Sequence, residues 1–384
     1  TFKKVDIDDE LILQHPTIEQ FVDQEVTYKV KEIADDFDGL LTLKIQEGWK
    51  GEDPKEIADY DNCSGYINPM PSHFSGVSLS PFNALKNICL DYIETGKLPQ
   101  LTEQILNIQP EIHFDTAEKI EDSYEKIFEI TKNMNNTFLP IQGPPGTGKS
   151  TILGEVIAKL SKEGFKVAIA SNSYAAVFNL VKKVLPHLDT EVITFLDFKD
   201  KSIKDEIKQI PQINIPKSDD ASVGENIVAT TTNKICHQRY WDENKFDYLI
   251  IDEVGQVPLV TTIATTLSTK NLILIGDPNQ LPQVKKGTQP NKNNQSTFEY
   301  LINETNVIDK DKGVFLDKTF RLHPEINNFI SNYFYNNSLS FDKKNELRYL
   351  SHEDNSLKKT GIQFVEVNHT GNTLASSEEI KEIK

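Results

Sequence analysis

Cysteine, arginine and long apolar runs are scarce in this chain of 384 residues. The three cysteines, Cys63, Cys89 and Cys236, are far apart and form no C-x-x-C pair, so cysteines alone can build neither a zinc site nor an iron–sulfur cluster. No apolar run approaches the ~20 residues that cross a bilayer, and no basic-then-apolar signal segment is present. We therefore expect a cytoplasmic protein with no membrane partner.

The formal net charge of −17 excludes a protein that coats nucleic acid through bulk electrostatics, although it leaves room for a local basic groove. Arginine occurs only at Arg239, Arg321 and Arg348, so any arginine beside a motif stands out. The length fits two or three domains, and the hydrophobic fraction of 38% is that of a globular protein.

The segment Gly143–Thr151 reads GPPGTGKST and fits the phosphate-binding pattern G-x-x-x-x-G-K-[ST]. An apolar run at 138–142 predicts a strand before it, and apolar residues at helical spacing from Leu153 to Leu160 predict a helix after it. This order predicts a P-loop that binds ATP, with Lys149 at the β- and γ-phosphates and Ser150 on Mg²⁺. The predicted nucleotide-binding residues are Gly143, Pro144, Pro145, Gly146, Thr147, Gly148, Lys149, Ser150 and Thr151.

A second segment, FDYLIIDE at 246–253, is an apolar strand that ends in two carboxylates. After a P-loop, this pattern predicts that Asp252 holds Mg²⁺ and that Glu253 orients and deprotonates the attacking water. An acidic strand end facing solvent is the alternative interpretation of such a pair.

Two further segments, GDPNQLP at 276–282 and TFRLHPEI at 319–326, are not needed by a generic P-loop enzyme. Together with GPPGTGKST and IIDEVGQ they resemble the ordered motifs of superfamily 1 helicases, in the 5′-to-3′ group that includes RNA-decay helicases and replication nuclease-helicases. The segments 168–180 and 228–232 resemble the strand-binding motifs of that group.

The resemblance implies a role for each matching residue. Gln256 and Gln280 would couple the nucleotide state to strand binding, and Arg321 would contact the γ-phosphate. Phe320 stands where the family often places a tyrosine against adenine. The implied contacts to the backbone of single-stranded nucleic acid, with DNA modestly favoured over RNA, are Ser171, Asn172, Ser173, Thr230, Thr231 and Thr232.

Two features depart from the family pattern. No glutamine is present at 122–125, where the family places one that recognises adenine, so the strictness of the ATP preference stays open. The motifs of a second RecA-like domain, including its arginine finger, are absent, and we expect further domains in a longer polypeptide and weak hydrolysis by this part alone. A nucleotide-dependent binding or regulatory module without unwinding is the alternative function, and a P-loop kinase or loader ATPase is disfavoured by the two extra motifs.

The expected fold is α/β: a RecA-like P-loop NTPase domain with a parallel sheet, preceded by a small β-barrel-like module on a helical stalk. Short β-rich runs alternate with amphipathic stretches, at 138–142, 166–170, 191–195, 226–230, 247–251 and 271–275. The expected domains are 1–79 (β module), 80–136 (stalk), 137–350 (first RecA-like domain) and 351–384 (start of a second RecA-like domain, opened by a strand at 361–367).

Two local expectations concern the first two domains. Alternation at 26–30 and 41–45 predicts a hairpin, followed by an irregular stretch at 69–71. A capped helix at 81–95 should carry Leu85, Ile88, Cys89 and Tyr92 on one face.

Overall fold

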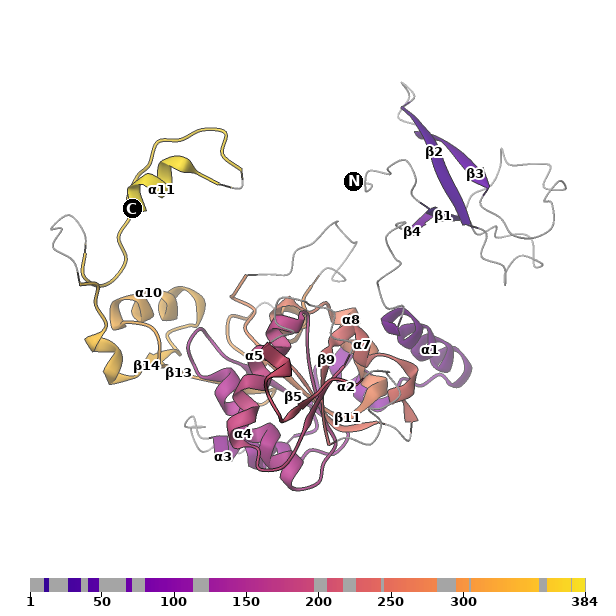
Figure 1. The fold of residues 1–384 in the computed structure, drawn as a ribbon, viewed down its shortest axis with the longest axis horizontal. Helices are drawn as coiled ribbons and strands as arrows, with labels where there is room; N and C mark the ends of the chain where they lie inside the picture. Colours follow the sequence, from indigo (N-terminus) through magenta and orange to yellow (C-terminus); the bar gives the residue numbers. More distant parts are fainter. Residues whose placement is uncertain are drawn as a thin grey trace. The chain divides into compact units, whose positions relative to one another are not determined.

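The protein is described here by a computed structural model (Figure 1). It describes residues 10–13, 27–35, 41–47, 67–70, 80–112, 124–196, 206–216, 226–242, 245–281, 295–303, 305–351, 358–373 and 375–383. The chain forms two compact units, one of residues 1–79 with 286–288 and one of the remaining residues. Within the described ranges, no helix is long and apolar enough to cross a membrane.

The smaller unit contains an antiparallel sheet of four strands in the order β3-β2-β1-β4. Its strands are β1 (Glu10–Leu13), β2 (Thr27–Asp35), β3 (Leu41–Glu47) and β4 (Ile67–Met70). β2 and β3 form the predicted hairpin. The irregular stretch expected at 69–71 is wrong at Pro69, which pairs with Leu11 in β4. β4 is an edge strand, where proline is tolerated because one side of the strand needs no amide hydrogen. β3 and β4 are both edges of the sheet, so these four strands do not show a closed barrel.

The larger unit is built on a sheet of eight parallel strands in the order β12-β5-β11-β10-β6-β9-β7-β8. Its strands are β5 (Phe138–Gln142), β6 (Val167–Ser171), β7 (Ile193–Phe195), β8 (Ile213–Asn214), β9 (Ile227–Thr231), β10 (Phe246–Ile251), β11 (Thr269–Gly276) and β12 (Val314–Phe315). This is the predicted RecA-like α/β fold. β11 separates the strand before the P-loop from the strand that ends in the acidic pair.

Helices cover both faces of this sheet (Figure 1). They are α1 (Ser80–Thr95), α2 (Gln100–Asn107), α3 (Tyr124–Lys132), α4 (Lys149–Lys162), α5 (Tyr174–Val184), α7 (Thr232–Ile235), α8 (Leu259–Thr265) and α9 (Thr297–Ile302). Successive strand residues point to opposite faces, so Ile169 joins the core under α3, α4 and α5, whereas Ala168 and Ala170 join the core under the other helices. Burial on both faces explains why these strands are apolar throughout.

Helix α1 buries only part of its apolar face. Ser80, Ala84 and Ile88 are its buried residues, a row with the i, i+4 spacing of one helix face. Cys89 is exposed, and Tyr92 is 51% exposed, although both lie on the face that the sequence groups with Ile88. The core contacts only a narrow row of α1, and the wider apolar stripe of the sequence therefore overstated the buried face.

The chain after β12 forms β13 (Lys318–Thr319), α10 (Pro324–Phe334), β14 (Ser340–Phe341) and α11 (Ser377–Ile383). β13 and β14 pair in parallel. Short 3₁₀ helices span Leu185–His187, Gln238–Tyr240, Val254–Gln256, Thr266–Ser268 and Lys343–Leu347. The strand expected at 361–367 is wrong: these residues pair with no strand among the described ones, and the Phe364 side chain is 87% exposed. Without a neighbouring strand, an apolar alternating run has neither a ladder nor a face to bury.

Gly154 provides a test of the packing between α4 and α5. A Cβ at this position would lie 2.4 Å from the carbonyl oxygen of Lys183. Alanine usually stabilises a helix by about 0.5–1 kcal/mol relative to glycine, but overpacking against backbone costs about 1–3 kcal/mol. We expect Gly154→Ala to lower the free energy of unfolding in urea, whereas Asn179→Ala, on the exposed face of α5, should change it by less than about 0.5 kcal/mol. A Gly154→Ala protein as stable as the wild type would contradict this packing.

Candidate nucleotide-binding site

The predicted P-loop lies between β5 and α4, at the carboxyl edge of the sheet. Gly146 and Gly148 have φ angles of 78° and 82°, a region that glycine adopts without steric cost. α4 begins at Lys149, so the unpaired N–H groups of its first turn and its positive dipole end face the loop. Ser150 lies in that first turn and is half-buried, while Thr151 is exposed.

The Lys149 side chain folds over the loop and fills the space beside Gly143. A Cβ on Gly143 would lie 2.3 Å from Cγ of Lys149, and the Lys149 Nζ donates a hydrogen bond to the Gly143 carbonyl at 2.6 Å. The Thr147 hydroxyl donates to the Pro144 carbonyl at 2.9 Å. At Gly148, by contrast, a Cβ would meet nothing within 4 Å. Side-chain-free backbone with a lysine beside it fits a chain of phosphates.

The acidic pair follows β10. Asp252 is 5% exposed and accepts a hydrogen bond from the Glu253 N–H at 2.9 Å. Burial, and then the negative charge of Glu253, raise the pKa of Asp252 to about 6, while the positive charge of Lys149 acts in the opposite direction. A buried carboxylate is costly unless a cation compensates it, so this position fits Mg²⁺. Within the described ranges, no group of three or more His, Cys, Asp and Glu side chains could hold a metal by itself.

Glu253 is also conformationally unusual, with a φ angle of 56°. The left-handed region costs a residue with a side chain roughly 1–2 kcal/mol and is frequent at functional sites. The turn that follows is tight, because the Gln256 N–H donates to the Glu253 carbonyl at 2.8 Å. Gln256 itself is half-buried.

The loop after β11 lies against both preceding segments. The Gly143 N–H donates to the Gly276 carbonyl at 2.9 Å, which ties the P-loop to the end of β11. A Cβ on Gly255 would lie 2.6 Å from the Asp277 carbonyl oxygen, so the turn after the acidic pair packs directly on the same loop. Gln280 is half-buried, and its Nε2 donates to Asp277 Oδ2 at 3.2 Å.

The segment Thr319–Arg321 closes the other side of the P-loop. The Phe320 N–H donates to the Gly146 carbonyl at 2.8 Å, and the Thr319 hydroxyl donates to the Pro145 carbonyl at 2.8 Å. A Cβ on Gly146 would lie 2.3 Å from Cβ of Arg321. The side chains of Arg321 and Phe320 are exposed, the latter by 46%. Three segments far apart in the sequence therefore meet around the P-loop: the turn after the acidic pair, the loop after β11 and Thr319–Arg321.

The residues predicted to contact single-stranded nucleic acid divide into two groups. The side chains of Ser171, Thr230 and Thr232 are buried, at 1%, 0% and 3% exposure, and their contact with nucleic acid stays a prediction. They lie at or beside the ends of β6 and β9, inside the fold, and the Ser171 hydroxyl donates to the Asp252 carbonyl at 3.1 Å.

The second group remains accessible. Asn172 and Ser173 are exposed and Thr231 is half-buried. Ser173 caps α5 by accepting a hydrogen bond from the Ala176 N–H at 3.2 Å. The Asn172 amide donates a hydrogen bond to the Gln256 carbonyl. This bond joins the segment predicted to bind single-stranded nucleic acid to the turn after the acidic pair.

Sequence reasoning missed several residues that hold this arrangement. The buried Asn345 donates to the Thr319 carbonyl at 3.0 Å and thereby supports the segment over the P-loop. Asp277 lies in the GDPNQLP segment, yet its role as the acceptor for Gln280 needed coordinates. Asn345 has no local signal, because its partner is 26 residues away.

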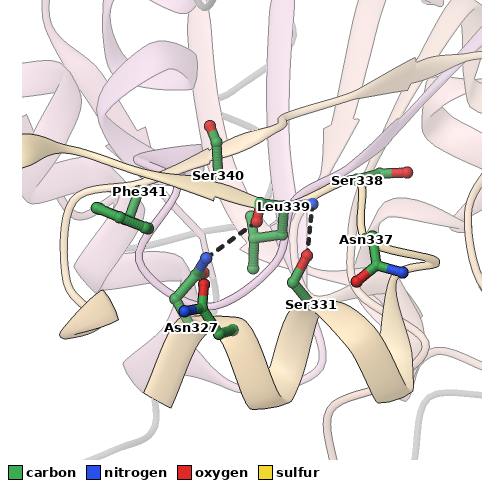
Figure 2. Close-up of a pocket in the computed structure, with 8 residues that line it drawn as sticks. Asn327, Ser331, Asn337, Ser338, Leu339, Ser340 and Phe341 are labelled. Carbon is green, nitrogen blue, oxygen red and sulfur yellow. Dashed lines mark hydrogen bonds between the residues drawn. The ribbon is translucent and has the colours of Figure 1, made fainter. Parts of the chain in front are cut away.

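A separate polar pocket of about 370 Å³ lies between α10 and the segment that leads into β14 (Figure 2). Its lining residues are Asn327, Asn328, Ser331, Asn337, Ser338, Leu339, Ser340 and Phe341, and none of the predicted site residues is among them. Two hydrogen bonds fasten its walls: the Asn327 amide donates to the Leu339 carbonyl at 2.9 Å, and the Leu339 N–H donates to the Ser331 hydroxyl at 3.0 Å. These two hydrogen bonds attach α10 to the segment that leads into β14.

Two family models, each described as an AAA domain, match this chain at residues 128–286 and 293–383. The first match contains the P-loop, the acidic pair and Gln280, and the second contains Arg321. Fold, site and matches together define a P-loop ATPase. More narrowly, the chain carries the domains of a superfamily 1 helicase and has distant homology to the DNA2 helicase/nucleases.

The DNA replication ATP-dependent helicase/nuclease DNA2 of Saccharomyces cerevisiae is 32% identical over 152 residues, which are 38% of this chain and 10% of the yeast protein. The helicase/nuclease JHS1 of Arabidopsis thaliana is 28% identical over 197 residues, covering 49% of this chain and 14% of the plant protein. The alignments thus span only a small part of these relatives. Among solved structures, the arterivirus nonstructural protein 10 helicase with DNA aligns with 88% of this chain and 59% of its own, at 12% identity and a TM-score of 0.37.

Two glycine substitutions test whether Thr319–Arg321 covers the P-loop. Gly146 and Gly148 both have positive φ angles, so alanine costs roughly 1–2 kcal/mol of backbone strain at either position. Only at Gly146 would the new Cβ also collide with Arg321. We expect Gly146→Ala to lower the melting temperature of the nucleotide-free protein more than Gly148→Ala does. Equal decreases would show that the two segments are not in contact.

Proposed function

We propose that this chain is the nucleotide-binding part of an ATP-dependent helicase that couples ATP hydrolysis to translocation along single-stranded nucleic acid and to duplex unwinding. The observation that carries the proposal is the convergence of the P-loop, the acidic pair, the Gln280 loop and Arg321 at one edge of the sheet. An ATPase that does not move along nucleic acid would need only the P-loop and the acidic pair. The homology to DNA2 helicase/nucleases supports the same function.

The proposed function gives each nucleotide-site residue a role. The P-loop backbone and Lys149 would bind the phosphates, and Glu253 would accept the proton of the attacking water. Gln280 and Arg321, which belong to segments that pack around the P-loop, would contact the γ-phosphate. The exposed ring of Phe320 offers a flat surface to the adenine base.

Ser150 and Asp252 are the residues that would hold Mg²⁺. When bound there, the ion neutralises phosphate charge that develops during transfer. The protein contributes a half-buried hydroxyl at the start of α4 and a carboxylate whose burial already disfavours an uncompensated charge.

Single-stranded nucleic acid would lie across the carboxyl ends of β6 and β9, against Asn172, Ser173 and Thr231. Polar groups of this kind bind the sugar–phosphate backbone without reading sequence. The bond from Asn172 to the Gln256 carbonyl gives this surface a direct connection to the nucleotide site. We favour DNA over RNA as the strand, in agreement with the DNA replication helicases to which the chain is similar.

Two substitutions should separate nucleotide binding from hydrolysis. Lys149→Ala removes the charge at the phosphates, so we expect it to abolish nucleotide binding in a calorimetric titration. Glu253→Gln keeps the shape but removes the base, so it should bind ATP normally while turnover by the full-length protein falls about 10²–10⁴-fold. Lys310→Ala, at an exposed lysine, is the control for the first change. A Glu253→Gln protein that hydrolyses ATP at the wild-type rate would overturn the assigned role of Glu253.

A strand-displacement assay tests the function itself. We expect the full-length protein to unwind a duplex with a 5′ single-stranded tail, and its ATPase to be stimulated more by single-stranded DNA than by RNA of the same sequence. Stimulation without strand displacement would favour the alternative, a nucleotide-dependent binding or regulatory module. Turnover that no strand stimulates would contradict both.

A further inference from the structure

Asp277 is a buried carboxylate beside the nucleotide site that the mechanism above does not use. It is 2% exposed, and its oxygens are occupied by protein donors. Oδ1 accepts the Asn279 N–H at 3.3 Å, and Oδ2 accepts both Gln280 Nε2 at 3.2 Å and the hydroxyl of Tyr335 at 2.6 Å. The shortest of these three bonds comes from a residue 58 positions away.

Tyr335 follows directly after α10 and is held from several sides. Its side chain is 1% exposed, and its ring centroid lies 6.0 Å from that of Phe315. Its N–H donates to the Ser331 carbonyl at 3.1 Å. The Asn279 amide donates to the Phe334 carbonyl at 2.9 Å, so the Gln280 loop and the end of α10 are joined by two separate hydrogen bonds. Ser331 also binds the Leu339 N–H, as Figure 2 shows.

The carboxylate determines which way the Gln280 amide faces. An ionised carboxylate only accepts hydrogen bonds, so the NH₂ group of Gln280 must turn toward it. The carbonyl oxygen of Gln280 is then turned away from the carboxylate. Burial, followed by the charge of Asp277, raises the pKa of the Tyr335 hydroxyl, which therefore remains a donor at neutral pH.

We propose that Tyr335 is a positioning residue that acts through Asp277 to fix the orientation of the Gln280 amide toward the γ-phosphate. The proposal rests on the role assigned to Gln280 above. It makes recognition of the γ-phosphate depend on the placement of α10, which belongs to the segment matched by the second AAA model. A movement of α10 would disturb the tyrosine bond directly, because Tyr335 follows α10 and Asp277 belongs to the Gln280 loop.

Tyr335→Phe is the test, because it removes the hydroxyl and keeps the ring against Phe315. We expect the affinity of the 384-residue chain for a non-hydrolysable ATP analogue to fall about tenfold, the scale of one weakened hydrogen bond to a charged group. The affinity for ADP, which lacks the γ-phosphate, should change less than about twofold. Calorimetric titration with the two nucleotides measures both values and needs no hydrolysis.

Tyr248→Phe is the matched control. Tyr248 is also buried, at 2% exposure, and its hydroxyl donates to the Thr131 carbonyl at 2.9 Å, among residues that hold α3 to the sheet. This change should lower stability in the same way without altering the ratio of the two nucleotide affinities. In the double variant Tyr335→Phe with Gln280→Ala, the tyrosine change should have no further effect on that ratio, because its target is already absent.

Three outcomes would overturn the proposal: a Tyr335→Phe ratio equal to that of the wild type, a loss of affinity for ADP as large as for the ATP analogue, or additive effects in the double variant. Failure of the proposed function is distinguishable from these. A wild-type chain that binds nucleotides normally while the full-length protein unwinds no duplex would contradict the helicase assignment and leave the tyrosine result valid. A wild-type chain that binds no nucleotide would overturn both.

Discussion

The parallel pairing of β5, β11, β10, β6 and β9 is the constraint on which the rest of the structure depends. Parallel strands end at the same edge of a sheet, and here their registers are matched: Gln142 is opposite Gly276, Ile251 is opposite Leu274, and Ser171 is opposite Thr231. Loops that leave these strands therefore start at one level. Segments more than one hundred residues apart in the chain meet without any long excursion of the backbone.

This arrangement has local costs that the sheet must offset. Asp252 is buried beside a second carboxylate, Glu253 adopts a left-handed conformation, and Gly146 and Gly255 lie where no side chain fits. The buried carboxylate and the left-handed Glu253 each destabilise the fold by an amount of the order of 1–3 kcal/mol. The apolar cores on both faces of the sheet hold the loops rigid despite these costs. The polar and strained positions lie at the strand ends, where phosphates would bring compensating interactions.

Much of the fold and of the nucleotide site followed from the sequence because the signals were local. A glycine pattern, an apolar strand before two carboxylates and helical spacing after Lys149 each depend on adjacent residues, and β5, α4 and β10 lie where these patterns predicted them. The burial of individual side chains did not follow from local patterns. Ser171, Thr230 and Thr232 are small polar residues at strand ends, which read as surface, yet neighbouring elements cover them. Likewise, the narrow contact row of α1 is set by its neighbours, which the periodicity of one helix does not reveal.

The connections between segments were beyond sequence reasoning for a related reason. Bonds from Tyr335 to Asp277, from Asn172 to Gln256 and from Asn345 to Thr319 span 58, 84 and 26 residues, and each uses a common polar side chain in no recognisable pattern. Yet these bonds determine how a movement in one segment affects the others. A hydrogen bond weakens steeply when its geometry changes, so a shift of the turn after Glu253 alters the support of Asn172 at once. Because the turn at Gly255 also packs on the Asp277 carbonyl, the same shift reaches Gln280. In the proposed function, one short turn of backbone would therefore connect the surface for single-stranded nucleic acid to the phosphate site.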